Sequence, residues 1–263
     1  MTPEGPNANS APAAGAPEAP APPGLSAAPP PPERDPFWGY SDLLWFLGMA
    51  VASMLAAWAV GWLTLAALKL KVAGLAAEMI VLYGLLFGSL QMMFRVRYDR
   101  PFWRSLGWTP TRLPVLWVII CGMFTAVLVA LASTLIRTPT GETPMTQLLD
   151  TRLDVLVMGM LGITLGPLCE ELAFRGFLQP LLVRSLGVVP GIALAAAAFG
   201  LLHYQEYGDS WRHALIIAMA GAAFGCMRQA TGSTKAAAIM HAAYNSLFFI
   251  ALMAEKRILP RPW

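Results

Sequence analysis

Two adjacent glutamates, Glu170 and Glu171, lie inside an apolar stretch that runs from Val155 to Val183. Arg175 follows Glu171 by four residues, so these two side chains share one face of a helix, while Glu170 is rotated by about 100°. Ionisable groups at membrane depth are costly and usually functional. We therefore predict that Arg175 neutralises Glu171, and that Glu170 points into a cavity as a general base or acid. The alternative is a structural ion pair beside an unrelated acid.

Two of the three histidines also lie in apolar segments, and each has a companion four residues away on the same helix face. Phe199 precedes His203, and Asn245 follows His241. Imidazole can take a proton, donate a hydrogen bond or bind a metal, and an asparagine amide can stabilise an oxyanion. Together with Glu170 these residues indicate one shared polar site, because three helices would otherwise each carry a costly polar group without a common purpose.

Other chemistries find little support in the sequence. His213 lies beside Trp211 and Arg212 at the start of a segment and is interpreted as an interfacial residue. The chain has no His-Glu-x-x-His pair, no intramembrane serine and histidine arrangement, and no pair of aspartates within helices. Three widely spaced cysteines support neither a disulfide framework nor a cysteine-based zinc site. The net charge of +3 is spread along the loops, which argues against nucleic acid as a partner.

The elements that must position these residues are membrane helices. Of the 263 residues 57% are hydrophobic, which is more apolar surface than a soluble core of this length could bury. A membrane-crossing helix needs about 20 apolar residues. Seven segments come near that length, and they predict an all-α, polytopic transmembrane bundle: 43–67, 73–94, 113–136, 154–184, 188–206, 212–229 and 235–254.

The chain divides into two parts. Residues 1–36 hold 12 of the 22 prolines and few large apolar side chains, which predicts a disordered Pro/Ala-rich tail. Residues 37–263 form one helical membrane domain. In a simple alternating topology His203 and His241 lie toward opposite faces of the membrane. Extending the fifth helix through Tyr207 and starting the seventh at Ser233 would bring them together; tilted helices or a re-entrant connection would do the same.

Three motifs follow one another in the predicted helices: Glu-Glu-x-x-x-Arg at 170–175, Phe-x-x-x-His at 199–203 and His-x-x-x-Asn at 241–245. In this order they resemble the CAAX prenyl endopeptidase and bacteriocin-processing family of intramembrane proteases, also called the Abi family. The resemblance covers about residues 150–250. It implies an intramembrane endopeptidase in which Glu170 and His203 activate water, His241 and Asn245 stabilise the oxyanion, and Glu171, Arg175 and Phe199 support them.

The resemblance also implies membrane lipid and a protein or peptide substrate as partners, and a multi-pass protein of the bacterial cytoplasmic membrane. The family has been described both as zinc enzymes and as metal-free glutamate proteases. One glutamate, two histidines and a water make a sensible zinc site. We favour the glutamate and water version, with no cofactor, although zinc is compatible with the residues. The rival function is a transporter, or a binding or immunity scaffold, that uses the same polar residues without catalysis.

Overall fold

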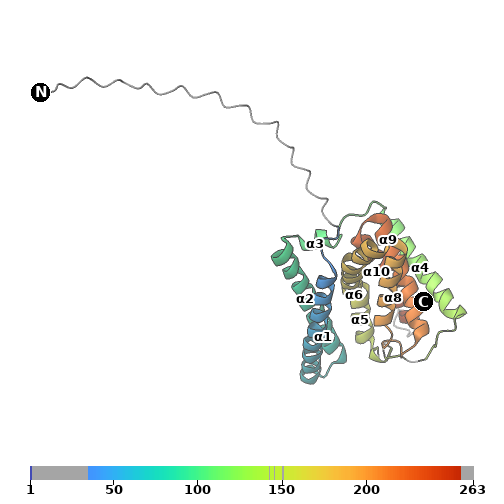
Figure 1. Ribbon diagram of the computed structural model, residues 1–263. Coiled ribbons are helices and arrows are strands. Elements are labelled where there is room, and N and C mark those ends of the chain that lie inside the picture. The colour runs from blue at the N-terminus through green and yellow to red at the C-terminus, as the bar shows by residue number, and fades with distance from the viewer. Residues whose placement is uncertain (2–34, 142, 145, 150, 256–263) are drawn as a thin grey trace. The chain divides into compact units, whose positions relative to one another are not determined.

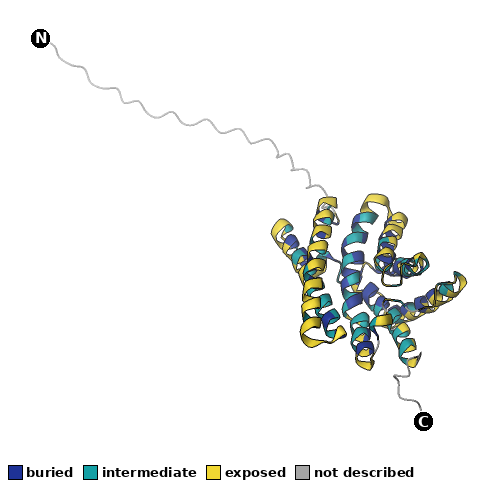
Figure 2. Ribbon diagram, turned by 90° about the horizontal axis from the view of Figure 1, so that it is seen from below, coloured by how far each residue is buried: buried dark blue, intermediate teal, exposed yellow. Residues whose placement is uncertain are grey.

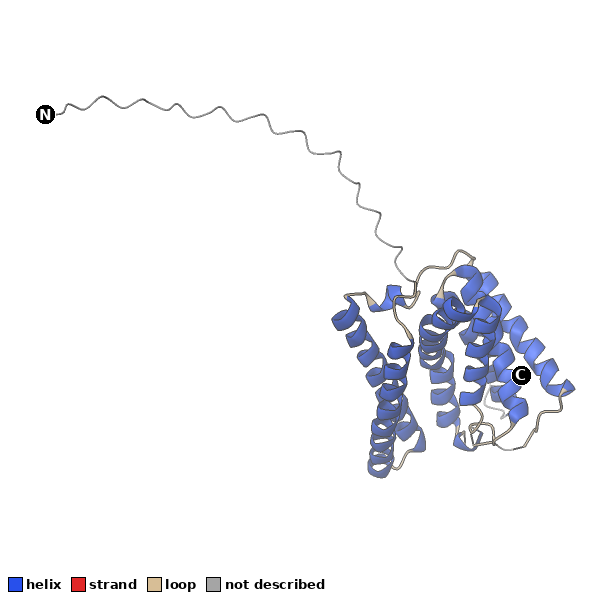
Figure 3. Ribbon diagram, viewed as in Figure 1, coloured by secondary structure: helices blue, strands red, loops and turns tan. Residues whose placement is uncertain are grey.

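The computed structural model describes Met1 and residues 35–141, 143–144, 146–149 and 151–255. Apart from Met1, Asp35 and Pro36, the predicted tail lies outside the described residues. Within these ranges every element of regular secondary structure is a helix, loops join the helices, and there is no strand (Figure 3). The predicted all-α class is therefore confirmed.

Six helical stretches are long and apolar enough to cross a membrane, in the part of the chain that is described. They are α1 (Tyr40–Leu68), α2 (Lys71–Tyr98), α4 (Val115–Leu135), the broken stretch Arg152–Leu186, α9 (Trp211–Thr231) and α10 (Thr234–Glu255). Six of the seven predicted segments correspond to these stretches. The seventh, predicted as 188–206, is the shorter apolar helix α8 (Val188–Leu202). The chain is an integral, multi-pass membrane protein.

Helices α1 and α2 pack against each other as an antiparallel pair (Figure 1). The pair is joined to the rest of the domain through an aromatic cluster that includes Trp38, Phe94 and Phe177. The Trp38 ring stacks on Phe177 at 5.3 Å, and its Nε1 donates a hydrogen bond to the Phe177 carbonyl at 3.1 Å. The short helix α3 (Phe102–Ser105) contributes Phe102 to the same cluster.

A second core cluster holds α4, α9 and α10 together, with Val118, Phe224 and Met240 among its buried residues. Helix α8 packs along α9, and α10 also contacts α5 (Arg152–Ile163) and α6 (Leu165–Glu171). Figure 1 shows α5 and α6 between the α1–α2 pair and the α8, α9, α10 and α4 group. The glutamates of α6 therefore lie in the interior of the helical domain.

The membrane stretch that carries both glutamates is irregular. Helix α5 ends at Ile163 and α6 begins at Leu165, because Pro167 has no N–H to continue the hydrogen-bond ladder. After Glu171 the chain winds as a π-helix, η2 (Leu172–Leu178), before α7 (Gln179–Leu186). Such π-helical turns are rare and often occur at functional sites. The irregularity coincides with the predicted site.

The outer faces of the helices carry large apolar side chains, as lipid contact requires. Trp58, Leu55 and Phe124 are each more than half exposed. Figure 2 shows exposed residues along the outward helix faces and buried residues toward neighbouring helices. The short 3₁₀ turn η1 (Thr146–Leu148) lies in the connection between α4 and α5.

Candidate active site

Glu171 and Arg175 form a buried ion pair, as the sequence predicted. Arg175 Nη1 donates to Glu171 Oε1 at 2.9 Å, and the two side chains are 1% and 0% exposed. Three aromatic rings surround the guanidinium, with the Phe199 centroid 4.6 Å from Cζ and those of Phe224 and Phe174 at 5.5 and 5.8 Å. Rings of this kind attract cations. The arginine is therefore held by charge, shape and hydrogen bonding.

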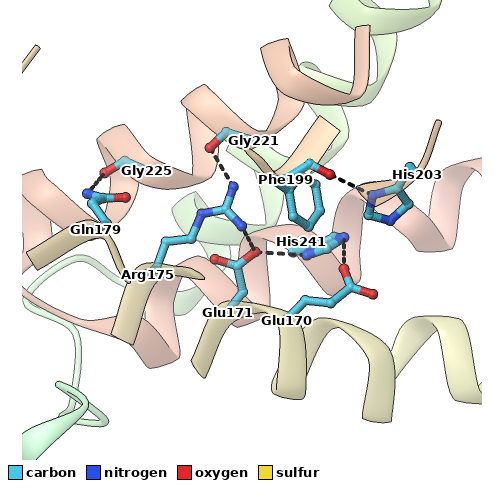
Figure 4. A network of polar contacts seen from close by, with 9 residues as sticks. All are labelled: Glu170, Glu171, Arg175, Gln179, Phe199, His203, Gly221, Gly225 and His241. Carbon is cyan, nitrogen blue, oxygen red and sulfur yellow. Dashed lines mark hydrogen bonds and ion pairs between the residues drawn. The ribbon is translucent and has the colours of Figure 1, made fainter. Parts of the chain in front are cut away.

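Arg175 also ties the site to α9. Its Nη2 donates to the Gly221 carbonyl at 2.6 Å, and one turn further on Gln179 Nε2 donates to the Gly225 carbonyl at 3.0 Å (Figure 4). The close approach requires glycine, because a Cβ at position 221 would lie 3.0 Å from Arg175 Nη2 and one at 225 would lie 2.8 Å from Gln179 Oε1. Sequence reasoning missed this ladder, although the matched four-residue spacings of Arg175 with Gln179 and Gly221 with Gly225 were a usable signal.

His241 lies between the two glutamates. Its Nδ1 is 2.9 Å from Glu171 Oε1, and its Nε2 is 3.8 Å from Glu170 Oε2. Because a carboxylate already paired with Arg175 can only accept, the Nδ1 atom carries the hydrogen. Glu171 therefore fixes which ring nitrogen faces Glu170. Figure 4 shows this chain of contacts from Arg175 through Glu171 and His241 to Glu170.

Aromatic side chains hold the two imidazole rings in place. Phe224 stacks on His241 with centroids 4.4 Å apart and an interplanar angle of 21°. The Phe199 ring lies edge-on to His241 with the ring centroids 5.8 Å apart, and its centroid is 4.7 Å from that of His203. Phe199 thus contacts both histidines and Arg175. These contacts are consistent with its predicted role in supporting the polar site residues.

His203 occupies the end of α8. That helix ends at Leu202, four residues before the end of the predicted segment, and residues 203–208 form turns. Of the arrangements left open by the sequence, an extension of this helix through Tyr207 therefore does not occur. The His203 N–H bonds to the Gly200 carbonyl at 3.2 Å, and the freed Phe199 carbonyl lies 2.9 Å from His203 Nδ1. A carbonyl oxygen only accepts, so Nδ1 donates and Nε2 is left as an acceptor. The end of the helix therefore sets the tautomer of His203.

The predicted site residues are brought together only in part. Glu170, Glu171, Arg175, Phe199, His203 and His241 gather from four elements, as Figure 4 shows. Among the described residues His241 lies within 4.0 Å of Glu170, whereas no ion pair joins Glu170 to His203. The Glu170 side chain is 25% exposed and makes no hydrogen bond in the part of the chain that is described. It is therefore less constrained than Glu171, Arg175 and His241, which are at most 5% exposed and make contacts of 2.9 Å.

Asn245 lies one turn beyond His241 on α10, where its Nδ2 donates to the Gly162 carbonyl at 2.7 Å. It lines a mainly apolar cavity of about 490 Å³ among α4, α5, α9 and α10. Tyr207, His213 and Tyr244 supply polar groups to the same cavity. A substrate segment in this cavity would therefore lie next to Asn245. His213, which was interpreted as an interfacial residue, faces this cavity as well.

The loop after His203 adds two polar groups to the site. Desolvation by the surrounding protein raises the pKa of the Glu206 carboxyl. His203 lowers this pKa, and the negative charge of Glu170 raises it further. Burial raises the pKa of Tyr207 to about 12, and Glu206 and Glu170 add to that rise. Both residues are therefore electrostatically coupled to Glu170. The sequence alone did not single out Tyr207, because a tyrosine in a loop carries no motif.

A zinc ion would need three converging protein ligands. Within the described ranges, no group of three or more His, Cys, Asp or Glu side chains is placed to hold a metal. His203 and His241 each leave Nε2 unbonded, because Nδ1 of His203 is bonded to the Phe199 carbonyl and Nδ1 of His241 to Glu171, but these atoms and Glu170 do not form such a group. The residues as arranged do not fit a zinc site, so the chemistry below is derived from side chains and water.

Residues 152–247 match the family model described as type II CAAX prenyl endopeptidase Rce1-like. The match covers all three motifs and confirms the family expected from them. No curated protein and no solved structure matches the chain significantly.

Proposed function

Because residues 152–247 belong to the Rce1-like family of type II CAAX prenyl endopeptidases, we propose that this protein is an intramembrane endopeptidase in which Glu170 activates the attacking water. The observation that carries the proposal is the chain of contacts Arg175, Glu171, His241 and Glu170. It leaves one partly exposed carboxylate, beside an oriented imidazole, inside a helical membrane domain.

The attacking water is held by two acceptors. His203 Nε2 has a free lone pair because Nδ1 is bonded to the Phe199 carbonyl, and the Glu170 carboxylate accepts as well. One water hydrogen can go to each. As the water oxygen bonds to the scissile carbonyl carbon, Glu170 takes its proton. That proton then passes to the leaving nitrogen as the C–N bond breaks.

The oxyanion is stabilised by two donors on α10. Asn245 Nδ2 has a second hydrogen beyond the one it gives to Gly162, and His241 Nε2 donates when the ring is protonated. A charged ring is compatible with the surroundings, because Arg175 and His241 would then balance Glu170 and Glu171. Buried charges are tolerated when they are paired in this way. Acceptors for water and donors for the oxyanion thus come from different helices.

The substrate is proposed to be a membrane-associated or lipidated protein or peptide. The mainly apolar cavity of about 490 Å³ beside Asn245 suits an apolar segment entering from the membrane. We place the protein in the cytoplasmic membrane of a bacterium, as the bacteriocin-processing branch of the resemblance implies.

A trapping experiment tests the function. The full chain and its Glu170→Gln variant are expressed in the same host, and the termini of membrane proteins are compared by mass spectrometry. We expect new carboxyl termini only with the unchanged chain, and uncleaved substrates that co-purify with the variant. Identical termini with the unchanged chain and with the variant would overturn the proposal and favour a transporter or an immunity scaffold.

A further inference from the structure

A mainly polar pocket of about 260 Å³ lies apart from the cavity beside Asn245. Its lining comes from the residues before α1, from α3, from α7 and from the end of α9. Six of the residues that line it are Asp35, Ser105, Gln179, Arg184, Arg228 and Gln229. Two guanidinium groups and one carboxylate are the charged groups of this lining, so its formal charge has an excess of one positive charge.

Arg228 is a half-buried cation without a partner. It lies in the last turn of α9, where a positive charge stabilises the end of a helix. That role leaves its donors unused, because no hydrogen bond or ion pair reaches them in the part of the chain that is described. The Nε atom is buried, whereas the two Nη atoms are not sealed off in this way. The Nη atoms are therefore the donors that Arg228 offers to the pocket.

The protein holds both guanidinium groups in place but leaves most of their donors unused. A Cβ at Gly107 would lie 2.6 Å from Arg228 Nη2 and 3.0 Å from its Cζ, so this guanidinium packs against the turn after α3. Arg184, in the last turn of α7, donates from Nη1 to the Pro36 carbonyl. A guanidinium has five N–H donors, so Arg184 keeps others for a ligand. The pocket thus presents donors that are positioned before a ligand arrives.

We propose that this pocket binds a phosphodiester group, which accepts hydrogen bonds from the Arg184 and Arg228 guanidinium groups. Phosphate oxygens accept hydrogen bonds and match the planar fork of a guanidinium. A phosphodiester carries one negative charge, which balances the excess positive charge of the lining even with the Asp35 carboxylate present. This site does not depend on the peptidase reaction.

The place of the pocket in the fold favours the headgroup of a membrane lipid as the source of the phosphodiester. Arg184 and Arg228 lie near the ends of two membrane-crossing stretches, Arg152–Leu186 and Trp211–Thr231. The adjoining helix α3 carries exposed Trp103, and tryptophan is enriched where membrane meets water. Basic pockets between membrane helices bind anionic headgroups. A soluble phosphodiester has the same chemistry, and the test separates the two sources.

The test measures ligand binding to the full chain in micelles of a non-ionic detergent. Native mass spectrometry counts the bound molecules of phosphatidylglycerol, of diacylglycerol with the same chains, or of glycerophosphoglycerol, which is the same headgroup without chains. We expect phosphatidylglycerol to bind and diacylglycerol not to bind. The double variant Arg184→Gln/Arg228→Gln should weaken binding of phosphatidylglycerol at least about tenfold, because charge-assisted hydrogen bonds to both guanidinium groups are lost.

The matched control is Arg104→Gln/Arg112→Gln, which removes the same two charges at exposed positions outside the lining. It should bind phosphatidylglycerol like the unchanged chain. A second variant, Gln229→Glu, keeps the packing of Arg228 and adds a negative charge at an exposed lining position. It should weaken binding while thermal unfolding stays unchanged.

Three results would overturn the proposal. They are equal binding of diacylglycerol and phosphatidylglycerol, no binding of either phosphodiester, and an equal loss of binding in the Arg104 and Arg112 control. Binding of glycerophosphoglycerol without the lipid, lost in the Arg184 and Arg228 variant, would support the phosphodiester site and assign it to a soluble ligand.

Discussion

Replacing Arg175 with methionine should destabilise the protein strongly, because it leaves Glu171 as a buried carboxylate without its cation. The ion pair is 2.9 Å long and both side chains are at most 1% exposed. Removing one partner of a buried pair costs about 3–5 kcal/mol. The Gly221 carbonyl also loses the hydrogen bond that Arg175 Nη2 donates at 2.6 Å.

The double variant Glu171→Gln/Arg175→Met should recover part of this loss, since it removes both charges. A glutamine oxygen can still accept from His241 Nδ1, so the remaining cost is mainly the lost hydrogen bond from the Arg175 guanidinium to the Gly221 carbonyl, about 1.5–3 kcal/mol. We therefore expect the double variant to be more stable than the single Arg175→Met variant by roughly 2 kcal/mol.

The assay is reversible unfolding in mixed detergent micelles, followed by far-ultraviolet circular dichroism, with the free energies compared in one double-mutant cycle. If the single Arg175→Met variant loses less than about 1 kcal/mol of unfolding free energy, the reasoning is refuted, because even exposed ion pairs contribute up to about that much to stability. A double variant as unstable as the single one would refute it too, because the uncompensated charge would then not be the cause.

Three further predictions concern the surroundings of the site. Gly221→Ala should destabilise the fold by about 1–3 kcal/mol through overpacking, because its Cβ would lie 3.0 Å from both Arg175 Nη2 and the Phe199 ring. Thermal unfolding measures this loss. The control is Gly48→Ala, because a Cβ at position 48 meets nothing within 4 Å. Asn245→Ala should lower kcat by about 10²–10³ with a smaller change in KM, as loss of an oxyanion donor does; an unchanged kcat would remove that role. Treatment with a zinc chelator should leave peptidase activity intact, and activity lost with a stoichiometric metal and restored by zinc would contradict the glutamate and water mechanism.

Much of the helix layout could be predicted from the sequence, because apolar length is a strong local signal. The segment predicted as 73–94 corresponds to Lys71–Tyr98, and that predicted as 235–254 to Thr234–Glu255. The pairing of Glu171 with Arg175 was also predictable, since four-residue spacing on a helix places two side chains together.

The tertiary contacts were not predictable in the same way. Nothing local says that Glu171 contacts His241, 70 residues later, or that the Gly162 carbonyl accepts from Asn245. The predicted fifth helix, 188–206, is longer than the observed α8, Val188–Leu202. Hydropathy does not reveal that His203 Nδ1 donates a hydrogen bond to the Phe199 carbonyl. Side chains that bond to their own backbone end helices without an apolar signal.

The most direct test of the central claim is the single-turnover cleavage rate of the Glu170→Gln variant in reconstituted vesicles. A library of lipidated peptides, or a substrate trapped as above, serves as the probe. Glu170 makes no hydrogen bond within the described residues and is 25% exposed, so the variant should unfold at the same temperature as the unchanged chain. We predict a rate lower by about 10²–10⁴, the usual contribution of a general base. A rate within a fewfold of the unchanged protein would contradict the assignment of Glu170 as the base.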